Sequence, residues 1–163
     1  MSDPVSLFPV SYGGNHMLAA ISKKDRSSFQ CPVCGNGLPQ LLAPPPFDAP
    51  CSECGSYLWC RRCGDTDSVL LEALPGRSPE PIEVERVIRT IVRDGKPGTV
   101  VLDLSRLEMI NSSFMARLIM LNRRIRDEGG TFFLKGLQPV VQEIFDRARL
   151  HMALDVIHDE ADP

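Results

Sequence analysis

From residue 68 onward, short apolar runs alternate with longer amphipathic segments. The apolar runs predict four β-strands, at residues 68–74, 99–104, 131–135 and 153–158. Apolar residues spaced three and four apart predict three helices between them, at residues 80–94, 112–128 and 139–149. This repeated strand-helix order implies right-handed crossovers and a mainly parallel sheet, so the predicted fold class is α/β.

Each predicted helix has one apolar face that we expect to lie against the sheet. In the first helix this face consists of Val84, Val87, Ile88 and Ile91. In the second it consists of Phe114, Leu118, Leu121 and Ile125, and in the third of Val140, Val141, Ile144, Phe145 and Ala148. The strand at 99–104, with sequence TVVLDL, is apolar on both faces, which is typical of a central parallel strand covered by helices.

The first 64 residues show no such alternation. Residues 1–26 contain scattered proline and glycine and have no sustained period, so we expect a flexible segment. Cysteines cluster between Cys31 and Cys63, and three prolines at 44–46 exclude a regular helix among them. A segment this short cannot bury enough apolar surface to fold unaided, so a metal is the expected staple.

Composition narrows the function classes. Apolar residues make up 43% of the chain and charged residues 24%, which is globular composition. The net charge of -3, with both signs interspersed, gives no field that attracts phosphate backbones, so wholesale nucleic-acid binding is disfavoured. Neither a secretory signal nor an apolar run of ~20 residues is evident. With six cysteines suited to a reducing compartment, the chain is expected to be cytoplasmic.

Two Cys-x-x-Cys-Gly motifs have the spacing of a four-cysteine zinc ribbon. Each two-residue gap turns both sulfurs toward one point, and the glycine that follows permits a positive φ. Four thiolates fill a tetrahedral coordination sphere and leave no position for water, as in structural zinc sites. The predicted Zn²⁺ ligands are Cys31, Cys34, Cys51 and Cys54. Buried free thiols or a disulfide pair are the alternative.

A third motif, Cys60-Arg-Arg-Cys63-Gly, has the same spacing. The aromatic and aliphatic stretch before it suits a strand that carries the chain away from the first pair. We therefore exclude Cys60 and Cys63 from the predicted zinc site. Exchange of this pair with Cys51 and Cys54 as ligands, and a redox Cys-x-x-Cys, are open alternatives.

The start of the second predicted helix has residues that could carry a switch. Asn111, Ser112 and Ser113 are all good N-cap types. A helix N-terminus presents free N–H groups and the positive end of a dipole, so it would accommodate a phosphate on Ser112. Capping alone selects the same residues, and from the residues alone it is the favoured interpretation.

The stretch VVLDLSRLEMINSSFMARL, residues 100–118, resembles the STAS (sulfate transporter and anti-sigma factor antagonist) family. Members carry a strand like VVLDLS, a hydrophobic residue, Asp-Ser-Ser-Gly and a helix. Residues 129–139, GGTFFLKGLQP, are similar to a later segment of that family. The resemblance implies a STAS-like α/β domain at 57–163, after a flexible segment at 1–26 and a zinc ribbon at 27–56. It also places Cys60 and Cys63 on the first strand of that domain.

The resemblance implies a regulatory, protein-binding role by partner switching. In that family, an anti-sigma factor kinase binds the domain and is released when a serine at the helix start is phosphorylated. Carried over to this sequence, the phosphoacceptor is Ser112, with Ser113 as the alternative. The partner-binding residues implied are Asn111, Phe114, Met115 and Arg117. Asn111 stands where the family has Asp, and Phe114 where it has Gly.

A zinc-ribbon adaptor for nucleic acid or transcription machinery is the alternative function, with the α/β half as scaffold. Against it, Arg61 and Arg62 are the only basic residues between positions 27 and 64, whereas a nucleic-acid reader should have a basic stripe. Enzymatic activity is not expected. The histidines His16, His151 and His158 have no ligand or triad spacing, and no groups with perturbable pKa values converge in the sequence.

Overall fold

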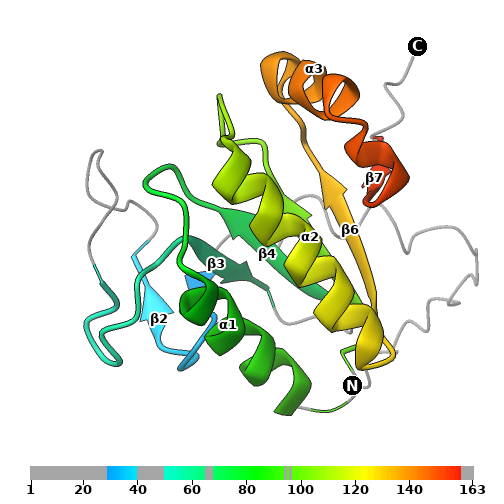
Figure 1. Ribbon diagram of the computed structural model, residues 1–163. Helices are drawn as coiled ribbons and strands as arrows, with labels where there is room; N and C mark the ends of the chain where they lie inside the picture. Colours follow the sequence, from blue (N-terminus) through cyan, green and yellow to red (C-terminus); the bar gives the residue numbers. More distant parts are fainter. Residues whose placement is uncertain (1–28, 40–49, 65–67, 94, 96, 159–163) are drawn as a thin grey trace, which may run out of the picture.

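The computed structural model describes residues 29–39, 50–64, 68–93, 95 and 97–158 (Figure 1). The segment predicted to be flexible, residues 1–26, lies outside the described residues. The strands are β1 (Phe29–Gln30), β2 (Gly37–Leu38), β3 (Cys60–Cys63), β4 (Val69–Ala73), β5 (Thr99–Asp103), β6 (Thr131–Lys135) and β7 (Asp155–Ile157). The helices are α1 (Pro81–Arg93), α2 (Ser112–Asp127), α3 (Pro139–Arg147) and the 3-10 helix η2 (Leu150–Met152). The strands and helices predicted downstream of residue 68 are all present, with ends shifted by at most two residues.

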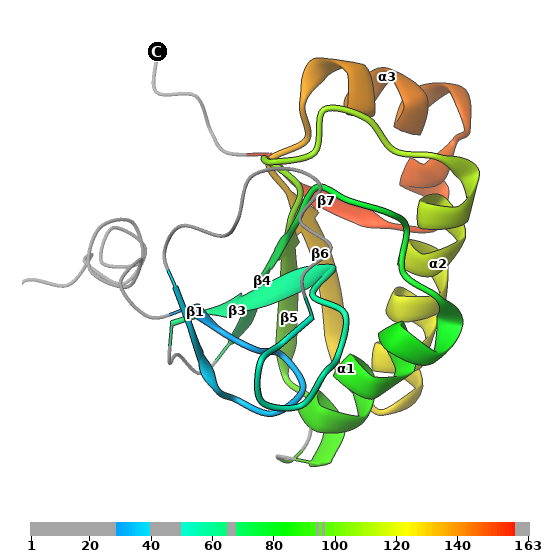
Figure 2. The ribbon, with the colours of Figure 1, turned by 90° about the vertical axis from the view of Figure 1, so that its left-hand side faces the viewer.

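The seven strands form one sheet in the order β2-β1-β3-β4-β5-β6-β7. From β4 to β7 all pairs are parallel, and each crossover moves to the next position in the same direction. Right-handed crossovers that all move one way place their helices on the same side of a sheet. Figure 2 shows this arrangement, with α1 and α2 side by side on one face. The mainly parallel α/β fold is therefore as predicted.

Within the described residues, helices cover only one face of the central strand β5. Because both faces of this strand are apolar, the sequence had predicted helices on both, and this prediction was wrong. Val100 and Leu102 point to the helices and are completely buried. On the opposite face, Val101 is half-buried in a row with Leu70 and Phe133. The sequence pattern does not show how the crossovers turn, and their common direction leaves this face without a helix.

The core lies between the sheet and α1 and α2. The predicted apolar faces of these two helices are buried at all eight positions. The apolar face predicted for the third helix was wrong at two positions, because Val140 is 51% exposed and Ala148 is also exposed. Helix α3 is short and buries only a narrow stripe formed by Val141 and Phe145. Its outer apolar residues therefore remain at the surface.

The cysteine segment continues the same sheet. Strand β1 pairs antiparallel with β2 on one side and with β3 on the other. Strand β3 pairs antiparallel with β4, with Cys60 opposite Ala73 and Cys63 opposite Leu70. The guanidinium of Arg61 lies 3.3 Å from the centroid of the Phe29 ring and pairs with Glu72. The N-terminal strands are thus held by both backbone and side-chain contacts.

We expect the substitution Leu102→Ala to lower the free energy of unfolding by about 2–5 kcal/mol, because it leaves a cavity in the centre of the core. Chemical denaturation measures this value. The matched control Val140→Ala removes an exposed apolar side chain and should change stability by less than about 1 kcal/mol. Equal losses for the two variants would contradict the assigned core.

Candidate metal centre and partner surface

The two first cysteine motifs form turns with the same hydrogen bonds. The Gly35 N–H donates to the Cys31 carbonyl (2.9 Å), and the Cys31 N–H donates to the Asn36 carbonyl (2.8 Å). The same two bonds recur in the second turn, around Cys51 and Gly55, at 2.9 Å. Gly35 and Gly55 have φ angles of +76° and +68°, which glycine adopts without steric cost. Each motif is therefore folded into a turn around its two sulfurs.

The two turns bring four cysteine sulfurs together. The Sγ atoms of Cys31, Cys34, Cys51 and Cys54 all lie within 4.8 Å of one another, and each of these thiols is free. The Sγ–Sγ distances are 3.8 Å between Cys31 and Cys54 and 3.7 Å between Cys34 and Cys51. Four sulfurs each about 2.3 Å from a tetrahedral zinc ion would be about 3.8 Å apart. The cluster therefore has the size and donor chemistry of a zinc tetrathiolate.

The cluster lies at the boundary between core and solvent. Cys31 and Cys51 are buried, whereas Cys34 and Cys54 are exposed. Burial raises the pKa of the Cys31 thiol to about 12. Burial also acts upward on the pKa of Cys54, but hydrogen bonds from Ser56 and the neighbouring cysteines outweigh it and lower that pKa to about 6. Four adjacent thiolates repel one another, so a cation is needed to keep all four deprotonated.

Two contacts fix the cluster to the rest of the fold. Cys31 and Cys51 pack with Leu58 and Leu74 in a small apolar cluster. The Thr90 hydroxyl of α1 lies 3.2 Å from the carbonyl oxygen of Val33, within the first turn, and can donate to it. The first turn therefore rests on α1, and the cysteine cluster has a defined place beside the helical layer.

Cys60 and Cys63 lie outside this group. They are three residues apart on β3, so their side chains point to opposite faces of the sheet. Cys60 is fully buried in the core and Cys63 is half-buried on the other face. Burial raises the pKa of both thiols, that of Cys63 to about 11. This geometry favours neither a redox pair nor exchange of these thiols with the ligands of the cluster.

The N-terminus of α2 is capped by Asn111. Its Oδ1 atom accepts the Phe114 N–H (2.9 Å) and the Ser78 hydroxyl (2.8 Å). The next two residues, Ser112 and Ser113, are exposed. The first turn contains no acidic residue, so the positive end of the helix dipole has no opposing charge nearby on the helix.

The other residues implied by the family resemblance differ in accessibility. Phe114 is only 7% exposed and packs in the core, so its side chain offers little surface to a partner. Met115 is half-buried against the core. Arg117 is half-buried, and its Nε atom donates to the Pro79 carbonyl (3.0 Å). Met109, just before the cap, is 73% exposed.

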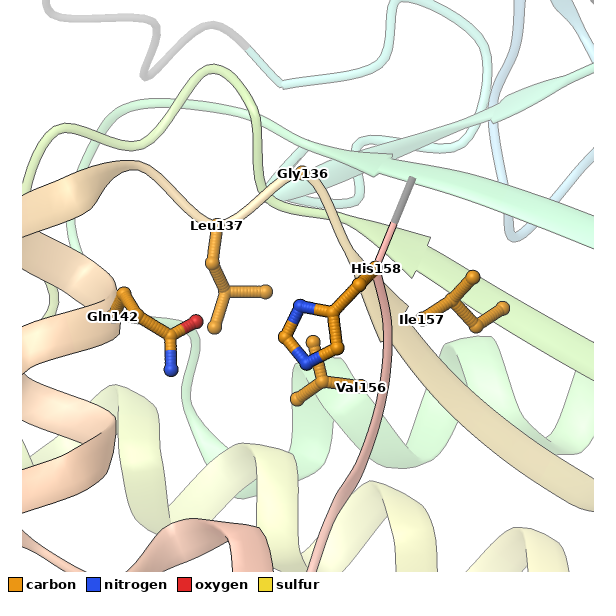
Figure 3. A pocket seen from close by; sticks show the side chains of 6 residues that line it. All are labelled: Gly136, Leu137, Gln142, Val156, Ile157 and His158. Carbon is orange, nitrogen blue, oxygen red and sulfur yellow. The ribbon is translucent and has the colours of Figure 1, made fainter. Parts of the chain in front are cut away.

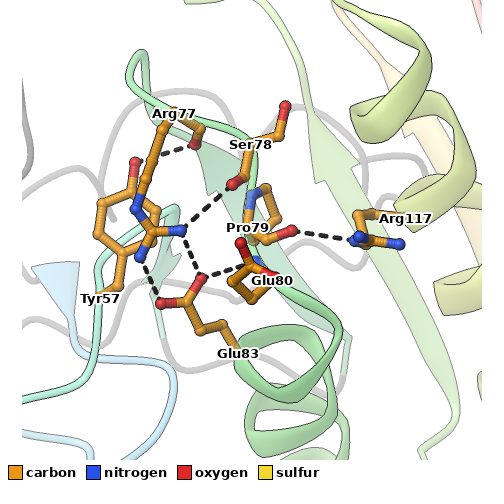
Figure 4. Close-up of polar contacts among 7 residues, drawn as sticks. All are labelled: Tyr57, Arg77, Ser78, Pro79, Glu80, Glu83 and Arg117. Atoms are coloured by element: carbon orange, nitrogen blue, oxygen red, sulfur yellow. Dashed lines mark hydrogen bonds and ion pairs between the residues drawn. The ribbon is translucent and has the colours of Figure 1, made fainter.

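Sequence reasoning missed the segment Arg77–Glu80. This segment contacts Tyr57, which follows the second cysteine turn, on one side and Arg117 of α2 on the other (Figure 4). The Tyr57 hydroxyl donates to the Arg77 carbonyl (3.0 Å), and the Arg77 guanidinium lies 3.9 Å from the centroid of the Tyr57 ring. The same guanidinium donates to both carboxylate oxygens of Glu83, at 2.8 and 2.5 Å, which lowers the pKa of Glu83. The Tyr57–Arg77 contact joins residues 20 apart, so no local motif signals it.

A shallow pocket of about 220 Å³ lies at the carboxyl ends of β6 and β7. Figure 3 shows its lining residues, which are Gly136, Leu137, Gln142, Val156, Ile157 and His158. None of the metal-site or partner-site residues predicted from the sequence lines it.

A family model described as Mlab, STAS domain matches residues 82–156, from the first turn of α1 to β7. The chain therefore contains a STAS domain, and the four clustered cysteines lie N-terminal to it. None of the curated proteins matches the sequence. In the described part of the chain, the helices are too short or too polar to cross a membrane.

Several solved structures are similar to this chain. An anti-sigma-factor antagonist (STAS) domain protein from Planctomyces limnophilus is 20% identical, with a TM-score of 0.47 over 63% of this chain and 91% of that one. A candidate anti-sigma factor antagonist from Thermotoga maritima is 16% identical, with a TM-score of 0.42 over 55% of this chain and 79% of that one. The NMR structure of the same Thermotoga protein is 15% identical, with a TM-score of 0.45 over 58% and 77%. The domain assignment rests on the family model over residues 82–156.

We expect the purified wild-type protein to contain one metal ion per chain and Cys51→Ser to contain none, because a tetrathiolate loses most of its affinity with one sulfur removed. Elemental analysis of reductively purified protein measures this. The matched control Cys63→Ser should retain the full metal content. Metal loss in the control variant, or a metal-free wild type, would refute the assigned ligand set.

Metal affinity should fall as the pH is lowered. Metal binding displaces protons from the thiols, and burial raises the pKa values of Cys31 and Cys34, which favours their protonated forms in the metal-free protein. High pH thus favours the metal-loaded state. Each displaced proton should weaken apparent affinity about tenfold per pH unit between pH 8 and 6. Competition with a chromophoric chelator measures this dependence, and a constant affinity across the range would argue against thiolate ligation.

Proposed function

We propose that this protein is a non-catalytic regulatory module that acts by partner switching, with Ser112 as the phosphoacceptor and Ser113 as the alternative. The observation that carries the proposal is an exposed Ser112–Ser113 pair at the start of α2 in a STAS domain. The partner is a protein, either an anti-sigma factor or a serine kinase. The family resemblance of residues 100–118 implies this partner class.

The electrostatics of the α2 N-terminus support Ser112 as a phosphoacceptor. The cap residue is the neutral Asn111 rather than an aspartate, and the first turn is free of acidic residues. A phosphate with about two negative charges on Ser112 would therefore meet the positive helix end without repulsion from a carboxylate in the first turn. Asn111 still performs the capping role, because its side-chain oxygen accepts the Phe114 N–H.

The position of Phe114 removes one objection to partner binding. A large side chain at the helix start would keep a partner away if it stood on the surface. The Phe114 side chain is instead buried in the core, so the exposed face at this point consists of Ser112 and Ser113. The exposed Met109 beside them adds an apolar contact of the kind that protein interfaces use.

We also propose that the cysteine cluster holds a structural Zn²⁺ ion and that the protein acts in the cytoplasm. The filled donor set supports a structural role, and the free state of all six cysteines suits a reducing compartment. The alternative of a nucleic-acid adaptor is less well supported. Arg61, one of two basic residues in the cysteine segment, is 3% exposed and paired with Glu72, so it adds almost nothing to a basic surface.

We expect Ser112→Asp to weaken partner binding about tenfold or more, because it places a negative charge in the interface. The partner is first captured from extract of the source organism with the wild-type protein and identified by mass spectrometry. Binding of purified variants is then measured by calorimetry. Ser112→Ala should bind like wild type, and so should Ala148→Asp, which adds the same charge at the exposed C-cap residue of α3.

Equal affinities for the Ala and Asp variants at position 112 would remove the switch and leave the binding function. Capture of no specific protein would count against both. Incubation with the captured kinase and ATP, followed by mass spectrometry, tests whether phosphate is added to Ser112 and whether Ser112→Ala abolishes the modification.

A further inference from the structure

We propose that metal occupancy of the cysteine cluster controls the partner surface at the start of α2, through the contacts Tyr57–Arg77 and Ser78–Asn111. The inference adds a regulatory input to the proposed function and rests on it only for its biological meaning. The structural coupling itself concerns the cluster and the helix cap, and it can be measured without a partner.

The first step connects the metal to Tyr57. The second cysteine turn is closed by the bond from the Cys51 N–H to the Ser56 carbonyl (2.9 Å), and Tyr57 follows directly. Tyr57 also pairs with Pro50 in an isolated antiparallel bridge across the base of this turn. Short cysteine turns depend on their metal for folding. The position of Tyr57 is therefore set by a structure that metal stabilises.

The second step connects Tyr57 to Arg77. The hydroxyl of Tyr57 holds the Arg77 backbone through a hydrogen bond, and its ring supports the guanidinium 3.9 Å from the ring centroid. The guanidinium in turn holds Glu83 in the first turn of α1. Figure 4 shows Arg77 between the Tyr57 ring and the Glu83 carboxylate. Both the backbone and the side chain of Arg77 thus depend on Tyr57 for a contact.

The third step connects Arg77 to the helix cap. The next residue, Ser78, donates its hydroxyl to Asn111 Oδ1 (2.8 Å), and the carbonyl of Pro79 accepts from Arg117 Nε (3.0 Å). The segment is therefore attached to the cysteine turn on one side and to α2 on the other. Displacement of residues 77–79 would take one hydrogen bond from the residue that caps Phe114 and another from Arg117.

These contacts make the cysteine turn the element with two states. With metal it is folded and Tyr57 supports the segment, whereas without metal Tyr57 loses its fixed position. Metal should therefore raise affinity for the partner, and the partner should raise metal affinity by the same factor, because coupling between two binding sites is reciprocal. The hydrogen bond between Thr90 of α1 and the first cysteine turn does not involve Tyr57 or residues 77–79, so it provides a control contact.

The test is amide hydrogen exchange by NMR on the full chain, without partner. In wild type, metal removal by a chelator should speed exchange of the Phe114 and Glu80 amides, which donate to Asn111 and Glu83, about 2- to 10-fold, the effect of one net hydrogen bond. Tyr57→Phe should still bind one zinc ion per chain and, with zinc bound, give the same increase, while its zinc affinity falls by no more than the same factor. Thr90→Val should leave Phe114 exchange at the wild-type rate. Exchange in β6 reports whether the domain stays folded.

Two results would overturn the proposal. One is an unchanged Phe114 exchange rate in zinc-loaded Tyr57→Phe, which decides the question even if the metal-free chain unfolds as a whole. The other is a wild type that binds no zinc. A failed partner capture with a positive exchange result would remove the proposed function and leave the coupling, so the two hypotheses fail separately.

Discussion

The antiparallel pairing of β3 with β4 is the interaction on which the arrangement of this molecule depends. It sets Cys60 opposite Ala73 and so joins the cysteine-bearing segment to the parallel part of the sheet. Among the described strands, β1 and β2 reach the rest of the sheet through β3, so this pairing fixes the place of the cysteine segment in the sheet. The pairing also brings Tyr57, which precedes β3, to the loop that follows β4.

Parallel pairing of β4 with β5 explains why this loop meets the α2 cap. The carboxyl ends of neighbouring parallel strands lie at the same edge of a sheet, so the segments that follow them are adjacent. Ser78 follows β4 and Asn111 follows β5, and their side chains are hydrogen-bonded at this edge. The second cysteine turn, the loop and the helix cap are thus linked by consecutive contacts, and the proposed coupling uses this series of contacts.

Much of the fold could be predicted from the sequence, because its determinants are local. Apolar spacing located β4 to β7 and the three main helices, and it identified Val84 and Phe114 as core positions. The repeated Cys-x-x-Cys-Gly spacing marked the turn-forming motifs, and the aromatic and aliphatic stretch before Cys60 set the third motif apart from the four cysteines that lie together. The Asn-Ser-Ser cap was equally local. The errors arose at Val140 and Ala148, where a helix at the margin of the core buries only one stripe.

What the sequence by itself determined was the set of elements and the chemistry available to each. The tertiary structure decided how motifs of equal spacing come to differ in conformation. Cys60-x-x-Cys63-Gly has the spacing of the other two motifs, and Gly64 has a φ of +68°, yet pairing with β4 extends its cysteines along a strand and separates their sulfurs. The contacts from Tyr57 to Arg77 and from Ser78 to Asn111 join residues 20 and 33 positions apart. Such contacts follow from strand order and register, which local spacing does not encode.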